Sequence, residues 1–319
     1  MFYYKVYNLK IKSYCKIVAL EKQSTPFIDE NVDVIIRKLN KKLSNIIFNC
    51  QYVTYVTNKY SPMLCYETDK YIILRFKNQF WIAINKLGNE IIIDENYFDL
   101  KMAHNLAIGS ALSLCFYFKG IIPLHASSIE INNSPVVFVA NSGTGKSTLM
   151  HSFVNKGYKC ITDDVLPIII DEEILRCISS KNLKVKLCKE NILLGDYEMS
   201  DDNIVTKLEN KYWISLNDSR RSVKDYVLSK IFILSPQIDL NLDTVIIEKL
   251  EGMGAFESII SNLHFIYALP LNTRRSIILK YFELLYSIDV YKIKYFKSFG
   301  IIDKIISNII GIMANVKNS

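Results

Sequence analysis

The sequence predicts an α/β protein in which a mixed sheet forms the core and a β-rich region precedes it. Residues 136–139, VVFV, read as a buried strand, and a glycine-rich turn and a helical segment that ends at Gly157 follow it directly. Runs of β-branched and aromatic residues, which are typical of strands, lie in the first hundred residues: Phe2–Tyr7, Gln51–Thr57, Tyr71–Phe76, Phe80–Ile84 and Glu90–Asp94. We therefore expect a β-rich region over residues 1–100, to which the sequence assigns no role, and a second domain over residues 101–319.

The remaining elements follow from periodicity and from their end signals. The segment VDVIIRKLNKKL fits either a strand or a helix, and we favour a strand at its start. Residues 101–120 are expected to form one helix, because apolar residues share one face and Gly120 closes it. Residues 251–319 alternate helices with one strand, Val290–Tyr295. The last helix, IIDKIISNIIGIMANV, carries isoleucines at helical spacing, so we expect it to pack on the core or on a partner subunit rather than on a membrane.

Residues 140–148, ANSGTGKST, have the pattern of a phosphate-binding loop between the first core strand and its helix. Small residues let backbone N–H groups point at phosphate oxygens. Lys146 can reach the β- and γ-phosphates of a nucleotide, and the Ser147 hydroxyl can ligate Mg²⁺. Ala140 stands where the strict pattern has glycine, which the loop tolerates if φ stays negative there. An ordinary turn before a helix explains the segment less well. The residues expected to contact the nucleotide are Asn141, Ser142, Gly143, Thr144, Gly145, Lys146, Ser147 and Thr148.

Two adjacent carboxylates, Asp163 and Asp164, end the short strand that follows this helix. That strand is expected to be paired, or nearly paired, with the strand of the phosphate loop. One carboxylate can hold Mg²⁺, and the other can accept the proton of an attacking hydroxyl. Neighbouring side chains point to opposite faces of a regular strand, so both serve one site only if the chain turns there, as nearby Pro167 indicates. The alternative is a solvated Asp-Asp turn.

A hairpin is predicted just before the phosphate loop. Asn132-Asn133 stands between two apolar runs and signals a tight turn. The strand over 136–140 is therefore expected to run antiparallel to 128–131 and to lie close to 159–163. In most proteins with this kind of loop, the strand before it has only parallel neighbours, so an antiparallel hairpin would distinguish this protein from them. It also brings His125 toward the mouth of the loop, where this residue is either a phosphate contact or a structural histidine.

In this order, the motifs resemble the catalytic core of HPr kinase/phosphorylase and its relatives. The matching residues are His125, Ser142, Gly143, Gly145, Lys146, Ser147, Asp163 and Asp164. The resemblance implies a phosphoenolpyruvate carboxykinase-like P-loop core with a mixed sheet over 101–319, and the ATP- and Mg²⁺-dependent phosphorylation of a serine hydroxyl. It implies that Asp163 is the general base and that Asp164 and Ser147 hold the metal. His125 and Lys146 would contact the reacting phosphates.

The resemblance extends to both ends of the chain. MFYYKVYNLKIKS and SIDVYKIKYFKSFGIIDKIISNI look like a subgroup of HPr-kinase-related proteins that accompanies peptide modification, including lasso-peptide precursor kinases. The glycine-rich LEIRGLG-type signature of HPr kinases proper is missing. The implied phosphoacceptor is therefore a peptide or small protein, or a small hydroxy metabolite as a weaker alternative. Two other readings remain open: an ATP-binding regulatory module, and a scaffold of a peptide-maturation system without kinase turnover.

Composition excludes several other classes. Seven cysteines without a CxxC pair favour reduced thiols in the cytoplasm, and the first residues lack the apolar run of a signal peptide. The longest apolar stretch is too short to span a bilayer, so no membrane partner is expected. A net charge of +7 is spread along the chain, which favours a solvated surface over a nucleic-acid footprint. A homo-oligomer is possible.

Phosphoryl transfer also needs a cation that stabilises charge in the transition state. Two pairs of arginines and one pair of lysines are the candidates: Arg220 and Arg221, Arg274 and Arg275, and Lys184 and Lys186.

Overall fold

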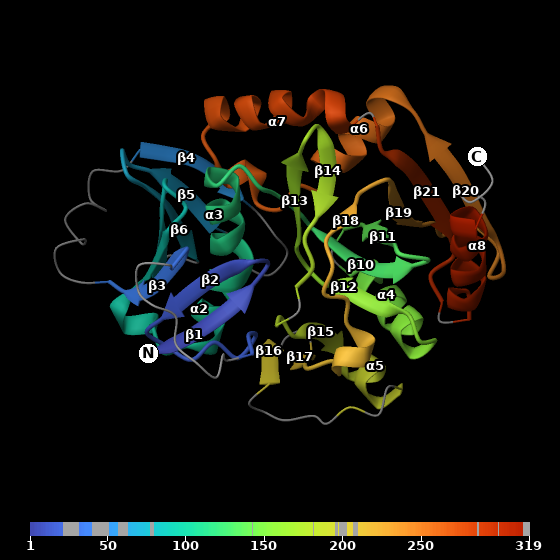
Figure 1. Ribbon diagram of the computed structural model, residues 1–319, viewed down its shortest axis with the longest axis horizontal. Coiled ribbons are helices and arrows are strands. Elements are labelled where there is room, and N and C mark those ends of the chain that lie inside the picture. Colours follow the sequence, from blue (N-terminus) through green and yellow to red (C-terminus); the bar gives the residue numbers. More distant parts are fainter. Residues whose placement is uncertain are drawn as a thin grey trace.

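The computed structural model of the chain describes residues 1–21, 32–39, 51–56, 63–76, 80–141, 143–180, 182–194, 197, 203–206, 210–285, 287–298 and 300–314. Within these residues the protein has a mixed α/β fold whose strands form sheets of eight, six, four and three strands. The eight-stranded sheet lies at one end and the six-stranded sheet at the other (Figure 1).

The eight-stranded sheet is built from the first hundred residues, in the order β1-β2-β3-β8-β7-β6-β5-β4. Its strands are β1 Phe2–Val6, β2 Leu9–Ser13, β3 Val34–Lys38, β4 Gln51–Val56, β5 Met63–Glu67, β6 Tyr71–Phe76, β7 Phe80–Asn85 and β8 Glu90–Ile93. All five predicted strands are present, and β3 confirms the strand at the start of VDVIIRKLNKKL. Strands β2 and β5 were not predicted, because lysines interrupt the first and polar residues flank the second.

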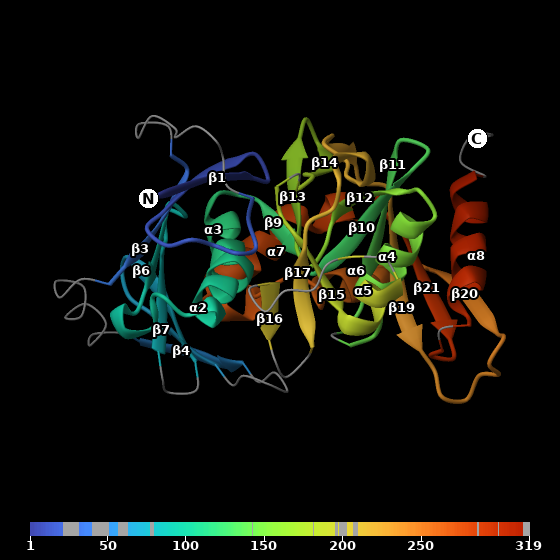
Figure 2. The ribbon, with the colours of Figure 1, turned by 90° about the horizontal axis from the view of Figure 1, so that it is seen from below.

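The helix predicted over residues 101–120 is divided into three parts. A π-helical turn, η3 (Ala107–Ala111), separates α2 (Lys101–Leu106) from α3 (Leu112–Phe118). Gly120 ends the run with φ of 73°, as predicted. These helices lie between the eight-stranded sheet and the rest of the molecule (Figure 2), and their residues share one hydrophobic core with both sides. π-Helical turns often mark functional positions, because they disturb the regular backbone ladder.

The six-stranded sheet carries the phosphate loop and has the order β12-β10-β11-β19-β21-β20. Its strands are β10 Ala126–Ile131, β11 Ser134–Val139, β12 Lys159–Thr162, β19 Lys230–Pro236, β20 Val245–Leu250 and β21 Asp289–Tyr295. Strand β11 is antiparallel to β10 and parallel to β19, which confirms the mixed sheet. Asn132 and Asn133 both have positive φ, as a type I′ hairpin turn requires. Strand β12 pairs with β10, so it lies one strand away from β11.

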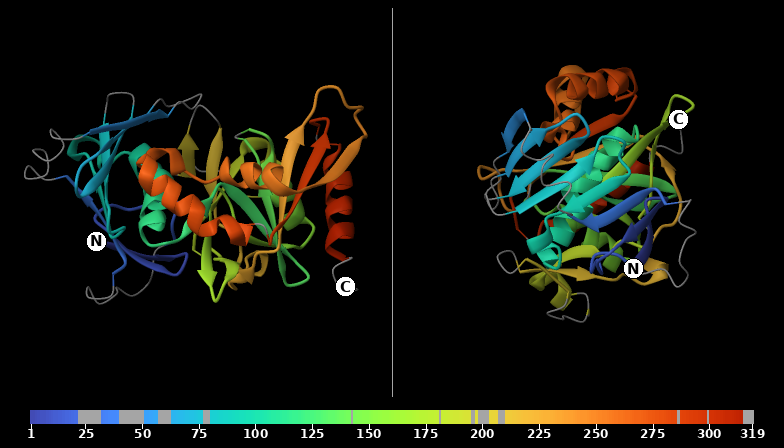
Figure 3. Two further views of the ribbon diagram at one scale, coloured as in Figure 1. Left: turned by 90° about the horizontal axis from the view of Figure 1, so that it is seen from above. Right: turned by 90° about the vertical axis from the view of Figure 1, so that its left-hand side faces the viewer.

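Helices cover both faces of this sheet. On one face, α4 (Lys146–Asn155) and α8 (Ile302–Ala314) pack with the side chains of β11 that include Phe138. On the other face, Val137 belongs to the core that also contains α6 (Gly252–Ile260) and residues of α7 (Leu271–Leu285). Figure 3 shows α6 and α7 lying across the molecule. The last helix buries its isoleucines, so the prediction that it packs on the core is confirmed.

Two smaller sheets complete the fold. The four-stranded sheet has the order β18-β14-β13-β9, with strands β9 Ile122–Leu124, β13 Leu166–Asp171, β14 Ile174–Cys177 and β18 Tyr226–Val227. The three-stranded sheet has the order β15-β17-β16, with strands β15 Val185–Cys188, β16 Ile204–Thr206 and β17 Lys211–Ile214, and α5 (Lys189–Leu194) follows β15. Pro167 lies within β13 opposite Pro123 rather than in a turn, so its interpretation as a turn signal was wrong. No helix in the described ranges is long and apolar enough to cross a membrane.

Candidate functional site

The glycine-rich segment over residues 140–148, which is predicted to bind phosphate and is called the phosphate loop below, connects β11 to α4. Gly143 and Gly145 have φ of 81° and 114°, a region that favours glycine, so both glycines are needed for the loop's path. Two residues at and just after the end of β21 bind the loop backbone. Lys297 Nζ donates to the Gly143 carbonyl at 2.6 Å, and the Tyr295 hydroxyl donates to the Thr144 carbonyl at 3.1 Å. Within the loop, the Thr144 hydroxyl donates to the Asn141 carbonyl at 2.6 Å. Ser142, one of the predicted phosphate contacts, lies outside the described residues.

Lys146 begins α4 and is buried, with 7% of its surface exposed. Its ammonium group donates to the carbonyl of Ala140 in the same loop. Burial lowers the pKa of Lys146 to about 8, although the carboxylates of Asp164 and Asp163 oppose this shift. Phosphate oxygens entering the loop would compete with the Ala140 carbonyl for this cation.

Asp163 follows β12 and is buried, with 3% of its surface exposed. Its Oδ1 accepts hydrogen bonds from the hydroxyls of Ser127 at 2.7 Å and Ser147 at 3.0 Å, and its Oδ2 accepts one from the backbone N–H of Lys186 at 3.0 Å. Burial raises the pKa of this carboxyl, while the hydrogen bonds oppose that shift. Both oxygens are thus engaged, and the Ser147 proton points at Asp163. The lone pairs of the Ser147 oxygen are therefore available to a cation.

Asp164 turns the chain. Its φ of 76° lies in the left-handed region, so its side chain leaves the strand alternation and joins the same site as Asp163. The predicted turn is therefore present, but at Asp164 itself. Oδ2 pairs with Lys186 Nζ at 2.6 Å, and Oδ1 lies 3.9 Å from Nε2 of His125. Burial would raise the pKa of Asp164, but the ammonium group of Lys186 outweighs it and lowers this pKa, so the carboxylate stays ionised.

Lys186 is the predicted cation that the structure brings to the aspartate pair. It lies on β15, where its backbone N–H contacts Asp163 and its ammonium group contacts Asp164. The ammonium group also lies 4.9 Å from the centroid of the Trp213 ring, a cation–π distance. Backbone and side chain of one residue thus fix the relative position of both carboxylates.

The predicted arginines contact other parts of the molecule. Arg220 donates to the Tyr197 hydroxyl at 2.9 Å, and Arg274 donates to the carbonyls of Tyr267 and Leu269. Arg221 is 5% exposed and donates to the carbonyls of Leu216 and Leu183, each at 2.8 Å, and to the Glu21 carboxylate at 2.9 Å. These contacts engage the Arg221 guanidinium within the fold, which favours a structural role over that of a phosphate clamp.

We expect Arg221→Ala to lower the free energy of unfolding by about 2–4 kcal/mol, because it leaves buried carbonyls without donors and a carboxylate without its partner. Urea denaturation followed by circular dichroism measures this change. Arg275→Ala is the matched control, because Arg275 is an exposed arginine on α7 and its loss should change stability by less than about 0.5 kcal/mol. Equal stabilities of the two variants would contradict the structural role of Arg221.

Two histidines meet beside Asp164, and the second was not predicted. A β-bridge joins Leu124 to Leu263. The backbone N–H of His125 donates to the Asn262 carbonyl and the backbone N–H of His264 donates to the Pro123 carbonyl, both at 2.8 Å. The rings of His125 and His264 consequently lie edge to face, with centroids 5.2 Å apart. No local signal in the sequence indicates this contact, because it depends on pairing between segments far apart in the chain.

Ser113 on α3 holds the ring of His264 through a hydrogen bond. The Ser113 hydroxyl donates to the Gly109 carbonyl in the π-helical turn at 2.8 Å and lies 2.7 Å from Nδ1 of His264. The hydroxyl has a single proton, so both hydrogen bonds form together when that proton is used at Gly109 and Nδ1 of His264 carries one of its own. Burial, aided by Lys146 and by its neighbouring histidine, lowers the pKa of His125 to about 3, and burial also lowers that of His264 to about 4. Both rings are therefore neutral at pH 7.

The site fits Mg²⁺ held together with phosphates rather than by protein alone. Among the described residues, no group of three or more His, Cys, Asp or Glu side chains could hold a metal ion. Mg²⁺ commonly keeps waters and binds one or two protein oxygens plus substrate phosphates. The oxygen of Ser147, whose proton is held by Asp163, matches that donor set.

Comparisons with known proteins do not identify a family for this chain. No family model and no curated protein matches the chain. Among solved structures, the chain is similar to the HPr(Ser) kinase/phosphatase from Coxiella burnetii, with a TM-score of 0.33 and 14% identity over 61% of this chain and 95% of that chain. A TM-score of this size is too low to support an argument about fold or function, so the family resemblance stays a prediction from the sequence.

Proposed function

We propose that the protein is a phosphotransferase that moves the γ-phosphoryl group of Mg-ATP to a hydroxyl group, specifically a serine of a peptide or small protein. The observation that carries the proposal is the hydrogen bond from Ser147 to Asp163 at the start of α4, beside Lys146 and the second carboxylate. The choice of serine and of a peptide acceptor rests on the resemblance of the motifs.

Nucleotide binding would use the loop in two ways. Backbone N–H groups over residues 143–148 and the Lys146 ammonium group would receive the β- and γ-phosphates in place of the Ala140 carbonyl. The Ser147 hydroxyl would continue to donate its hydrogen bond to Asp163, and its oxygen would bind the Mg²⁺ that accompanies the phosphates. A bound Mg²⁺ would neutralise the charge that develops on the phosphate oxygens.

The contacts favour a division of roles between the aspartates opposite to the predicted one. Asp163 has three donors on its two oxygens, so it suits the orientation of Ser147 better than the capture of a substrate proton. The Asp164 side chain is 27% exposed and faces His125, so an incoming hydroxyl could reach it. We therefore assign to Asp164 the role of accepting the proton of the substrate hydroxyl. Asp163 is assigned to the metal site, where it orients Ser147. The low pKa of Asp164 makes it a weak base, which phosphoryl transfer tolerates because positioning and charge stabilisation carry most of the acceleration.

We assign the two histidines to binding and positioning of the phosphoryl group that is transferred. His125 would contact the reacting phosphate, and His264 would hold the ring of His125 in place through their edge-to-face contact. We expect His125→Ala to slow transfer by about 10²-fold, the size typical for loss of one group that stabilises transition-state charge. His264→Phe keeps the ring packing but loses the hydrogen bond to Ser113, so it should slow transfer by about 3- to 10-fold. ADP formation at saturating ATP measures both.

ATP affinity is the control for the histidine variants and should stay within about threefold of wild type, because neither residue belongs to the phosphate loop. A loss of ATP affinity as large as the loss of turnover would place His125 in ground-state binding instead.

Incubation with γ-labelled Mg-ATP and serine-containing peptides, followed by mass spectrometry, tests the function directly. A phosphoserine product that depends on Mg²⁺ and is lost in Lys146→Ala is the expected result. ATP binding without transfer to any peptide, hydroxy metabolite or water would instead support a nucleotide-binding regulatory module.

A further inference from the structure

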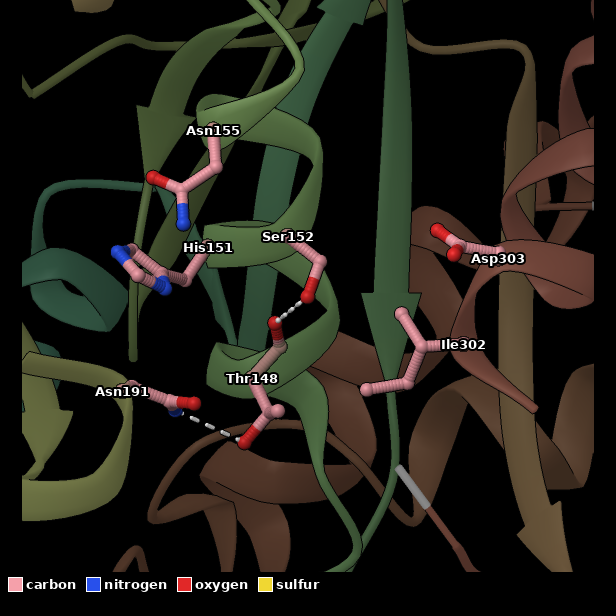
Figure 4. A pocket seen from close by; sticks show the side chains of 7 residues that line it. All are labelled: Thr148, His151, Ser152, Asn155, Asn191, Ile302 and Asp303. Carbon is pink, nitrogen blue, oxygen red and sulfur yellow. Dashed lines mark hydrogen bonds between the residues drawn. The ribbon is translucent and has the colours of Figure 1, made fainter. Parts of the chain in front are cut away.

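A groove of about 210 Å³ runs over the outer face of α4, between α5 and α8 (Figure 4). Its floor is formed by Thr148, Ser152 and Asn155, which lie four and then three residues apart and so share one face of the helix. Asn191 on α5 forms one wall, and Ile302 near the start of α8 contributes to the other. The volume is below the roughly 300–1,000 Å³ of a pocket that encloses a whole small-molecule ligand, so the groove fits part of a larger molecule.

The groove begins where the phosphate loop ends. Thr148 directly follows Ser147 and belongs both to the first turn of α4 and to the groove. Its hydroxyl accepts a hydrogen bond from the Asn191 side-chain amide at 3.0 Å, which ties the wall to the loop. If the phosphates of a nucleotide occupy the loop, the group attached to its α-phosphate would therefore lie at this groove.

The charges of the lining disfavour phosphate. The one charged residue among the groove residues described is Asp303, a carboxylate that pairs with Lys156 at 2.9 Å on the rim. The other polar groups are neutral hydroxyls and amides, which can donate to and accept from an uncharged ligand. The groove thus suits hydroxyl groups and a heteroaromatic ring rather than anionic groups.

His151 adds a buried ring nitrogen that has no hydrogen-bond partner in the described part of the chain. It lines the groove, is 2% exposed, and its Nε2 makes no hydrogen bond to the residues described. Burial, with a contribution from the Arg220 charge, lowers the pKa of His151 to about 4, so the ring is neutral at pH 7. The ring rests against Tyr197, with centroids 5.4 Å apart. A buried polar group without a partner costs stability, which a ligand could offset.

We infer that the groove over α4 binds the nucleoside part, the sugar and base, of the nucleotide whose phosphates the loop receives. The inference rests on the proposed function, because it needs a nucleotide in the loop. His151, Asn155 and Asn191 supply neutral donors and acceptors for the base and sugar, and Thr148 marks the passage from phosphate to sugar. Affinity for ATP should then exceed affinity for inorganic triphosphate by a margin that this groove provides.

Calorimetric titration of the full chain with Mg-ATP and with magnesium triphosphate tests the inference. Ser152→Trp places a large ring in the middle of the groove and should weaken ATP binding at least about tenfold. His151→Phe keeps the contact with Tyr197 but removes the ring nitrogens, and should weaken ATP binding about three- to tenfold. Both variants should bind triphosphate within about twofold of wild type. Lys159→Ala, an exposed substitution outside the groove, should change neither affinity.

The outcomes separate the inference from the proposed function. Unchanged ATP affinity in Ser152→Trp, equal losses for ATP and triphosphate, or a wild-type protein that binds the two equally would each overturn the nucleoside groove, while ATP binding that depends on Lys146 would still stand. If the wild type binds neither, both proposals fail. Thermal unfolding of each variant shows whether it is folded, and His151→Phe keeps the test decisive if the tryptophan variant does not fold.

Discussion

Asp164→Asn should slow phosphoryl transfer by about 10²–10⁴-fold, the range typical for loss of a catalytic proton acceptor, and leave ATP affinity within about threefold. Asparagine keeps the shape of the side chain and tolerates the left-handed φ of 76° at this position, so the backbone should not change. Single-turnover measurements of phosphate transfer at saturating Mg²⁺ isolate this step from binding.

Asp163→Asn is the comparison that distinguishes the two carboxylates. Its amide has one acceptor oxygen, so it either turns an NH₂ group against the Lys186 N–H or gives up the hydroxyls of Ser127 and Ser147, and both arrangements weaken the orientation of Ser147. This variant should need more Mg²⁺ but recover much of its rate when Mg²⁺ is raised. The reverse pattern, with turnover lost in Asp163→Asn at saturating Mg²⁺ and kept in Asp164→Asn, would support the roles predicted from the sequence.

Loss of the ion pair with Lys186 is a second effect of Asp164→Asn, and Lys186→Gln controls for it. That variant removes the cation and keeps the carboxylate, whose lowered pKa should then move back toward its ordinary value. If Lys186→Gln is as slow as Asp164→Asn, the ion pair rather than the proton acceptor sets the rate.

Lys146→Ala should weaken ATP binding at least about tenfold, because it removes a charge-assisted contact worth roughly 1.5–3 kcal/mol. Calorimetric titration measures the loss, and Lys159→Ala, an exposed change that removes the same charge, should leave the affinity unaltered. Unchanged affinity in a folded Lys146→Ala protein would remove the basis for nucleotide binding at this loop.

The pH dependence of ATP affinity provides an independent check on Lys146. Its pKa in the free protein is lowered to about 8 by burial, so above that pH the free ammonium group loses its proton. Phosphates favour the charged form, so binding above pH 8 must take up a proton, and affinity should fall as pH rises, by up to about tenfold per pH unit. Lys146→Arg keeps its charge throughout and should lack this fall. A flat profile in the wild type would show that Lys146 does not contact the phosphates.

Local signals in the sequence predicted the parts of the site that local structure determines. The Asn132-Asn133 turn and the glycines of the phosphate loop are required by backbone conformations that few other residues adopt, so they could be recognised directly. The phosphoenolpyruvate carboxykinase-like fold, the domain boundary and the roles of the site residues stay predictions.

The rest of the site depends on contacts that no short pattern encodes. His264 reaches His125 through a β-bridge between distant segments, and Ser113 reaches His264 from α3, directly after a π-helical turn that interrupts a helix predicted to be regular. Arg221 was nominated for its charge, but its burial and its carbonyl partners are properties of the tertiary structure. Long-range packing decides which polar residues face a site and which stabilise the fold.

The left-handed backbone conformation at Asp164 limits which substitutions this position tolerates without strain. Alanine or a branched residue would bring backbone strain of about 1–3 kcal/mol on top of any loss of chemistry, whereas glycine and asparagine fit the turn without the carboxylate. A lineage that abandons catalysis could therefore drift readily to glycine or asparagine at this position and keep a folded, nucleotide-binding protein. The same turn that gathers the two aspartates thus leaves open an evolutionary route by which the proposed catalysis could be lost while the fold is kept.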